Sequence, residues 1–167
     1  ETLKLQPRIL VLKSLTPQLK LQFTTEIKHQ GISQIEENIF SNQTLENKLW
    51  RVANTTNTPL ISGNQTSLGL LYNAKGWSLD IDSYYKTLKG ISTYGLNYLN
   101  QSFSAGKQRI LGTDVYLKKD FNNIKTYISY AFNTIESQYQ GINNNQYFTA
   151  SNQITHSITT AVAYKTK

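Results

Sequence analysis

The amino-acid sequence predicts an all-β fold: an antiparallel transmembrane β-barrel segment of about seven meandering strands with short periplasmic turns and long extracellular loops. Three observations favour this class. Apolar and polar residues alternate with a period of two in several segments, as in strands with one apolar face. Charged residues are only 16% of the chain, and neutral polar residues supply the rest of its polarity. The connections alternate between short and long, as expected of strands that cross a bilayer and return.

Seven segments carry the period-two alternation. It is most regular in residues 18–28, where Leu19, Leu21, Phe23 and Ile27 alternate with charged and amide residues. In a helix these apolar residues would be spread around the whole cylinder, so the segment is predicted to be a strand. In chain order, the predicted strands are 3–13, 18–28, 66–73, 76–86, 111–121, 126–133 and 157–164.

The connections between these strands predict a sheet with two different ends. Pro, Gly and Asn tolerate turn dihedral angles. They predict tight hairpin turns at 16–18, 73–76 and 122–123. Long polar links are expected at 31–63, 92–107 and 141–152. Aromatic residues beside the short turns would form a girdle at one membrane surface: Tyr72, Trp77 and Phe121.

Several functional classes find no support in the residues. Cysteine is absent, which excludes disulfides and thiol chemistry, and no spacing of residues predicts a metal site or a cofactor. No run of about eighteen apolar residues predicts a spanning helix. The net charge is +7, but Lys and Arg are scattered, so nucleic acid is not expected as a partner. No triad order or phosphate-binding loop predicts an enzyme.

Five charged residues are predicted to share the polar side of the strands: Asp80, Asp82, Lys86, Asp114 and Lys118. Asp80 and Asp82 would lie about 7 Å apart on one strand face, a spacing that glycoside hydrolysis can use. A network of opposite charges facing the lumen of a barrel is the simpler interpretation.

Aromatic residues and one arginine in the long links are candidates for ligand binding: Trp50, Arg51, Tyr94, Tyr98, Tyr147 and Phe148. Aromatic rings beside Asn and Gln suit contact with a sugar, a peptide or a siderophore at an outer mouth. The alternative is that these rings pack the loops against one another. Arg51 could bind an anionic ligand or pair with Glu46.

Several motifs, in this order and spacing, resemble those of a known family. They are the opening LQPRILVLKSLTPQLKLQFTTEIKHQGISQI, then GWSLDIDSYYKTLKGIS, GKQRILGTDVYLKKDF, and TYISYAFNTIESQY followed by NQITH. Together they resemble the C-terminal half of the β-barrel of a TonB-dependent outer-membrane receptor of the kind abundant in the Bacteroidota. Leu12 and Gln153 depart from the family pattern, where Tyr and Asp are common.

This resemblance implies a location in the bacterial outer membrane and a role in nutrient uptake. Such receptors fill a 22-stranded barrel with a plug and use energy from the TonB complex to import a bound ligand. The implied partners are outer-membrane lipid and lipopolysaccharide, the plug of the same receptor, TonB through an upstream segment, and in some relatives a surface lipoprotein lid. The ligand would be a small molecule, a glycan or a peptide.

The residues 1–167 would then be a partial receptor barrel domain, with the plug and the closing strands outside this chain. Seven strands cannot close a bacterial barrel, because such barrels have an even number. The missing initiator Met also favours a start of translation upstream of Glu1. Two alternatives stay open: a soluble carbohydrate-binding β-sandwich, and a small complete outer-membrane barrel with one more strand.

Overall fold

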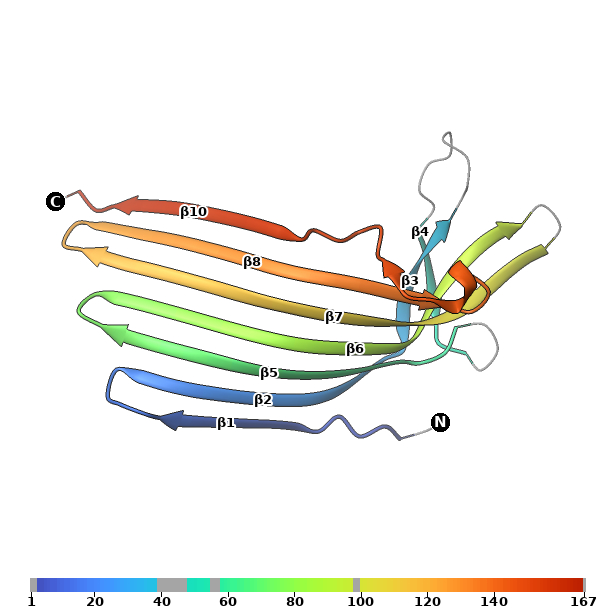
Figure 1. Ribbon diagram of the computed structural model, residues 1–167, viewed down its shortest axis with the longest axis horizontal. Coiled ribbons are helices and arrows are strands. Elements are labelled where there is room, and N and C mark those ends of the chain that lie inside the picture. The colour runs from blue at the N-terminus through green and yellow to red at the C-terminus, as the bar shows by residue number, and fades with distance from the viewer. Residues whose placement is uncertain (1–2, 39–47, 55–57, 98–99, 167) are drawn as a thin grey trace.

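A computed structural model describes residues 3–38, 48–54, 58–97 and 100–166. Ten strands belong to one sheet, and a single 3-10 turn, η1 (Asn143–Asn145), is the one helical element of these residues. The prediction of an all-β antiparallel fold is therefore confirmed. Figure 1 shows long strands running side by side, with short turns at one end and more elaborate connections at the other. We call these ends the turn end and the loop end.

Seven strands form a continuous path in which every neighbouring pair is antiparallel. The path runs through β1 (Arg8–Ser14), β2 (Leu19–Gln30), β5 (Ile61–Ala74), β6 (Trp77–Asn97), β7 (Asn100–Phe121), β8 (Ile124–Tyr139) and β10 (His156–Tyr164). All seven predicted strands lie on this path. β1 starts later than predicted, directly after Pro7, which lacks the N–H that a strand would use.

The register of these strands gives the sheet two chemically different faces. Leu70 lies opposite Ile81, Ile81 opposite Val115, and Val115 opposite Tyr130. Side chains directly opposite each other point to the same side, so the alternation of each strand adds up across the sheet. We call this side the apolar face, and the opposite side, which carries Asp82, the polar face.

The three predicted short turns are present at the turn end (Figure 1). In the turn between β5 and β6, Lys75 and Gly76 both have positive φ angles, of 50° and 75°. Two positive φ values at the centre of a two-residue hairpin favour Gly at the second position. A Cβ on Gly76 would also approach the carbonyl oxygen of Asp120 to 2.9 Å, so a larger residue would disturb the neighbouring turn.

The predicted long links contain more structure than the sequence indicates. β6 and β7 are 21 and 22 residues long, and only residues 98–99 separate them. The prediction of a long loop at 92–107 is therefore wrong. The link 31–63 contains β3 (Ile32–Asn38) and β4 (Lys48–Val52), and the link 141–152 contains η1 and β9 (Phe148–Thr149). Serine, threonine and asparagine continue the backbone pairing here without the alternation that an apolar environment imposes.

A bulge bends the sheet where β6 enters its loop-end extension. The pairing with β7 shifts between Lys89 and Ile91, and Gly90 between them has a φ of +82°. A Cβ on Gly90 would lie 2.6 Å from the carbonyl oxygen of Leu60, so no side chain fits at this position. Such bulges increase the local twist of a strand. Beyond this point the β6–β7 hairpin leaves the plane of the main sheet (Figure 1).

The described strands form one open layer, with β1 and β10 at its opposite edges (Figure 1). Among the residues that the structure describes, only two hydrophobic side chains, those of Ile35 and Ala150, are buried, and both lie at the loop end. Most of the apolar face is exposed, including Leu68 at 53% and Ile158 at 69%. Within the same residues, no helix has the length and apolar character needed to cross a membrane.

Candidate functional site

The polar face gathers three carboxylates at the centre of the sheet. Asp82 on β6 lies directly opposite Asp114 on β7, and Asp80 precedes Asp82 by two residues on the same face. The register also places Lys86 and Lys118 on this face, four residues beyond Asp82 on β6 and four residues beyond Asp114 on β7. All five residues predicted to share a polar side of the strands therefore do so.

The expected network of opposite charges does not form among these five residues. The Nζ atom of Lys118 lies 2.9 Å from the carboxylate of Asp120, at the turn end. Lys86 lines a small cavity of about 120 Å³ together with Glu26, whose carboxylate is 2.7 Å from the Nζ of Lys28. In the described part of the chain no ion pair reaches the three aspartates, and the Oδ1 atom of Asp82 is buried without a hydrogen-bond partner. Lys118 is instead paired with Asp120, and Lys86 lies four residues from Asp82 along β6.

Small residues on the polar face allow large side chains to lie close against the backbone. A Cβ on Gly112 would come within 2.4 Å of the Tyr84 ring, so this ring covers Gly112. Likewise, a Cβ on Gly69 would come within 3.2 Å of the Asp82 carboxylate. No group of three or more acidic or histidine side chains among the described residues is arranged to hold a metal ion. On this face large side chains therefore cover the glycines, while Asp80 and Asp114 are exposed and one carboxylate oxygen of Asp82 is buried.

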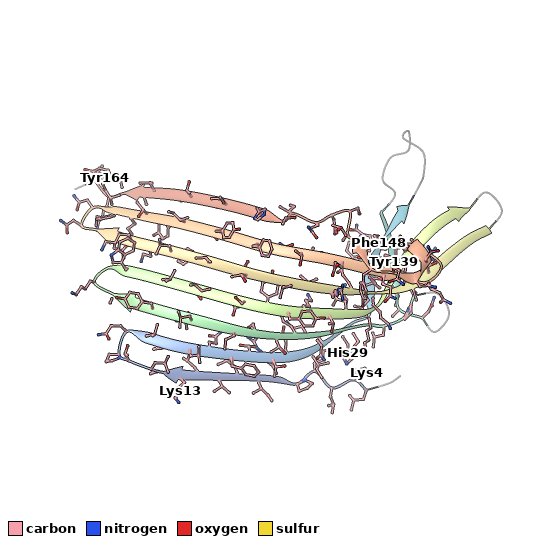
Figure 2. The ribbon with its side chains drawn as sticks, in the orientation of Figure 1. Lys4, Lys13, His29, Tyr139, Phe148 and Tyr164 are labelled. Carbon is pink, nitrogen blue, oxygen red and sulfur yellow. The ribbon has the colours of Figure 1, made fainter. Side chains whose placement is uncertain are left out.

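A pocket of about 260 Å³ lies at the loop end of the polar face, between the ends of β6, β7 and β8 and the segment that contains β9. The Nε2 atom of Gln108 donates a hydrogen bond to the Oγ of Ser137, 3.1 Å away, along one wall. The rings of Tyr139 and Phe148 form a second wall of the pocket, with their centroids 6.1 Å apart. Figure 2 shows these two residues together, at the opposite end of the sheet from Lys13 and Tyr164.

The lining of this pocket is neutral and mostly polar. It consists largely of hydroxyl and amide side chains, including Ser33, Gln34, Ser92, Thr93, Ser151 and Asn152. Such groups donate and accept hydrogen bonds without charge, and aromatic rings offer flat apolar surfaces. The pocket is slightly smaller than typical small-molecule sites of about 300–1,000 Å³. It suits part of a neutral polar ligand, such as one sugar ring or a peptide segment.

The structure distributes the six predicted ligand-binding residues over several elements. Phe148, in β9, lines the pocket. Trp50 and Arg51 lie in β4 and Tyr94 in β6, so these three, like Phe148, are strand residues within the predicted links. Tyr98 lies outside the described residues. These positions lie in strands because the backbone groups of the links form hydrogen bonds with neighbouring strands instead of remaining in open loops.

The sixth candidate, Tyr147, takes part in a charged cluster near the pocket. The guanidinium carbon of Arg109 lies 4.2 Å from the Tyr147 ring centroid, a cation–π geometry. The Nε of Arg109 also donates a hydrogen bond to the carboxylate of Glu136, opposite it on β8. This bond raises the pKa of Arg109 above its ordinary value. Arg109 is therefore already engaged by a protein carboxylate.

Sequence reasoning missed the residues that complete the pocket: Gln108, Ser137 and Tyr139. Gln108 and Ser137 stand opposite each other in the β7–β8 ladder. The predicted strand 126–133 ends before Ser137 and Tyr139, whereas β8 continues to Tyr139. The motif TYISYAFNTIESQY does continue to Tyr139, and it is the one signal that extends the strand this far.

Comparison of the chain with protein-family models, with curated protein sequences and with solved structures gives no match. The likeness to TonB-dependent receptors therefore depends on the quoted motifs, and the function is argued below from the faces of the sheet and from the pocket.

Proposed function

We propose that this chain is part of the barrel wall of an outer-membrane TonB-dependent receptor that imports a nutrient. In this proposal the apolar face contacts lipid, the polar face contacts the lumen and the plug, and the loop end faces the outside of the cell. The observation that carries the proposal is a band of exposed apolar residues on one face of the sheet, bordered on both sides by aromatic residues.

The dimensions of this band suit a lipid bilayer. On β7 it extends from Phe121 to Leu111, both about half exposed. That distance is about 33 Å along the strand, or about 25 Å across a membrane for a strand tilted by about 40°. Tyr72, Trp77, Phe121 and Tyr164 border it at the turn end, and Tyr85 and Phe132 at the other side. Aromatic girdles at both interfaces are typical of outer-membrane barrels.

Polar groups within the band satisfy one another. The hydroxyls of Thr25 and Thr66 lie 3.2 Å apart across β2 and β5, and those of Ser83 and Thr113 lie 3.0 Å apart across β6 and β7. At the turn-end border the Nζ of Lys119 lies 4.6 Å from the Trp77 ring centroid and donates a hydrogen bond to the carbonyl of Lys75. A lysine at this level can extend its charge to the headgroups.

The soluble β-sandwich is the alternative function, and the exposed apolar face weakens it. A sandwich needs a second sheet about 10 Å away that covers this face. All ten described strands belong to one sheet, and its apolar face has no covering layer among the described residues. A small complete barrel would need β1 and β10 to meet through one more strand, whereas they lie at opposite edges of the open layer.

The receptor function, beyond a barrel wall, is supported by the motifs quoted above and by the neutral pocket at the loop end. The pocket would hold part of the nutrient on the lumen side. Energy for release would come from the TonB complex, so this chain would contribute no chemistry. The expected ligand is a neutral glycan or peptide, because the pocket presents hydroxyls, amides and two aromatic rings.

The proposed location is tested on the natural protein that contains this chain. Membranes are separated into inner and outer fractions, and the intact mass of the polypeptide is measured after detergent extraction. We expect a mass several times 19.0 kDa in the outer-membrane fraction, and faster migration of the unheated protein on a denaturing gel. Recovery of a polypeptide of about this mass in the soluble fraction would instead support the β-sandwich.

The proposed ligand site is tested with Tyr139→Ala and Phe148→Ala in the same natural protein. Glycan and peptide arrays identify a ligand, and binding is then measured by calorimetry. Stacking on an aromatic ring contributes about 1 kcal/mol, so each variant should bind about fivefold to tenfold more weakly. Tyr164→Ala is the matched control, since it removes an aromatic ring at the turn end. Equal affinity in all four proteins would exclude this pocket as the ligand site.

A further inference from the structure

A second and larger pocket lies on the apolar-face side of the sheet, near its loop end. It has a volume of about 550 Å³ and is lined by Lys89, Lys107, Gln138, Gly90, Gly106 and Tyr139, among others. Lys89, Lys107 and Gln138 lie side by side on β6, β7 and β8, in one row across the sheet. None of the predictions from the sequence used these residues.

The two lysines form an unfavourable pair in the absence of an anion. Directly opposed residues in an antiparallel pair have Cβ atoms about 5 Å apart, and like charges at this position are destabilising. Both side chains are exposed, and within the described residues neither forms an ion pair. The nearest acidic side chain on the same face, Glu136, is bonded to Arg109. An anionic ligand would remove this repulsion.

The bulge at Gly90 makes this position concave. It shifts the register directly after Lys89 and turns the rest of the β6–β7 hairpin out of the sheet. Gly106, which also lines the pocket, presents only its backbone here, because a Cβ there would point to the polar face, where it would meet the Tyr139 ring. The side chain of Gln138 is fixed by a hydrogen bond from its Nε2 to the carbonyl of Asn145, 2.6 Å away. Its amide oxygen remains as an acceptor for a ligand hydroxyl.

The apolar band begins two same-face residue pairs from the two lysines, in the direction of the turn end. The first pair is Thr87 and Arg109, and the second is Tyr85 and Leu111, which are 48% and 54% exposed. A molecule that occupies both regions must have an anionic head and long apolar chains. A soluble anion would use the lysines and leave the band uncovered.

We infer that this pocket binds the phosphorylated headgroup of a membrane amphiphile in the outer leaflet, with phosphate between Lys89 and Lys107 and acyl chains along Leu111 and Tyr85. Ammonium groups bind phosphate by charge-assisted hydrogen bonds. This inference rests on the proposed membrane function, since it needs the apolar face to meet lipid. It adds a specific site that fixes the height and rotation of the barrel relative to the outer leaflet.

The test uses the natural protein that contains this chain, delipidated in a non-ionic detergent without phosphate. Native mass spectrometry measures binding of diphosphoryl lipid A, the same lipid after removal of both phosphates, and inorganic phosphate alone. The variants are Lys89→Gln, Lys107→Gln, both together, and Lys125→Gln. Lys125 carries the same charge on an exposed site at the turn end, so it controls for overall charge.

We expect one tightly bound diphosphoryl lipid A, about tenfold weaker binding by the double variant, and unchanged binding by Lys125→Gln. Comparable binding of the dephosphorylated lipid would overturn the inference, as would an equal effect of Lys125→Gln. Binding of inorganic phosphate as tight as that of the lipid would show that the ligand is a soluble phosphate compound. A protein that fractionates with the outer membrane but shows no lysine-dependent lipid binding would refute this site and leave the proposed function standing.

Discussion

The contact between Tyr84 and Gly112 shows how a single residue can determine the packing of the polar face. The ring occupies the space that a side chain at Gly112 would need, and Gly112 itself is buried beneath it. Aromatic rings that cover glycines on a neighbouring strand are a known means of stabilising sheets. The pairing also places Tyr84 next to Asp82 and Asp114 on the same face.

Replacing Gly112 with alanine should therefore force the Tyr84 ring away. We expect Gly112→Ala to lower the free energy of unfolding by about 1–3 kcal/mol, as overpacking does. Urea unfolding of the detergent-solubilised protein, followed by circular dichroism, measures the effect. In the double variant with Tyr84→Ala, the loss should be clearly smaller than the sum of the two single losses. Additive losses would show that the two residues do not compete for space.

The opposed carboxylates of Asp82 and Asp114 make a second prediction at this scale. Like charges directly opposite each other destabilise a sheet by about 0.2–1 kcal/mol. Asp114→Asn should remove this repulsion and raise the free energy of unfolding by that amount at pH 7. The gain should disappear near pH 3, where carboxylates are largely protonated in both proteins. The same urea titration at both pH values checks this, and an equal gain at both would exclude charge repulsion as the cause.

At the scale of elements, the sequence predicts the strands that border the apolar band and misses what continues beyond it. Each strand alternates where its two faces meet different environments, as Leu21, Gln22 and Phe23 do on β2, and there the register follows from the pattern. Residues 92–107 are mostly small and neutral, so nothing distinguishes a strand from a loop. The pocket could be predicted only in part for the same reason. Phe148 is an aromatic residue among polar ones, while Tyr139 lies beyond the last residue of the predicted strand 126–133.

The turn between β5 and β6 offers a test at this scale. Gly76→Ala places a side chain at a positive φ, which costs about 1–2 kcal/mol, and brings it against the carbonyl of Asp120. We expect a lower free energy of unfolding by at least this amount. Lys75→Asn should instead raise stability slightly, because Asn accepts a positive φ more readily than Lys. The urea midpoints of both variants check the expected opposite signs.

Two neighbouring residues of β8 test which face meets lipid. Ile128 lies on the apolar face and Ser129 on the polar face, and both are exposed. Ile128→Arg should lower stability in lipid vesicles by about 2–4 kcal/mol, as a buried charge near the membrane centre does. Ser129→Arg should have a small effect, because it places the same charge in a wet lumen. Equal effects in urea unfolding from vesicles would contradict the assignment of the faces.

At the scale of the whole molecule, the two tryptophans lie in different environments. Trp77 borders the apolar band, whereas Trp50 lies in β4 at the loop end and is 66% exposed. In vesicles that contain brominated lipid, Trp77 should be quenched and Trp50 should not. The quenched fraction of the emission should therefore decrease in Trp77→Phe and increase in Trp50→Phe, because Trp50 contributes only unquenched emission. A decrease in neither variant would mean that the band does not contact lipid.

The open layer also has a consequence for the exchange of backbone amide hydrogens with solvent. A strand inside the sheet has neighbours on both sides, while β1 and β10 each have one, so about half of their amides point away from the sheet. In this arrangement, deuterium would label the two edge strands within seconds and β6 and β7 far more slowly. The labelling times would thus reproduce the order of the strands. Slow labelling of β1 and β10 in the natural protein would show that each of them pairs with a further strand.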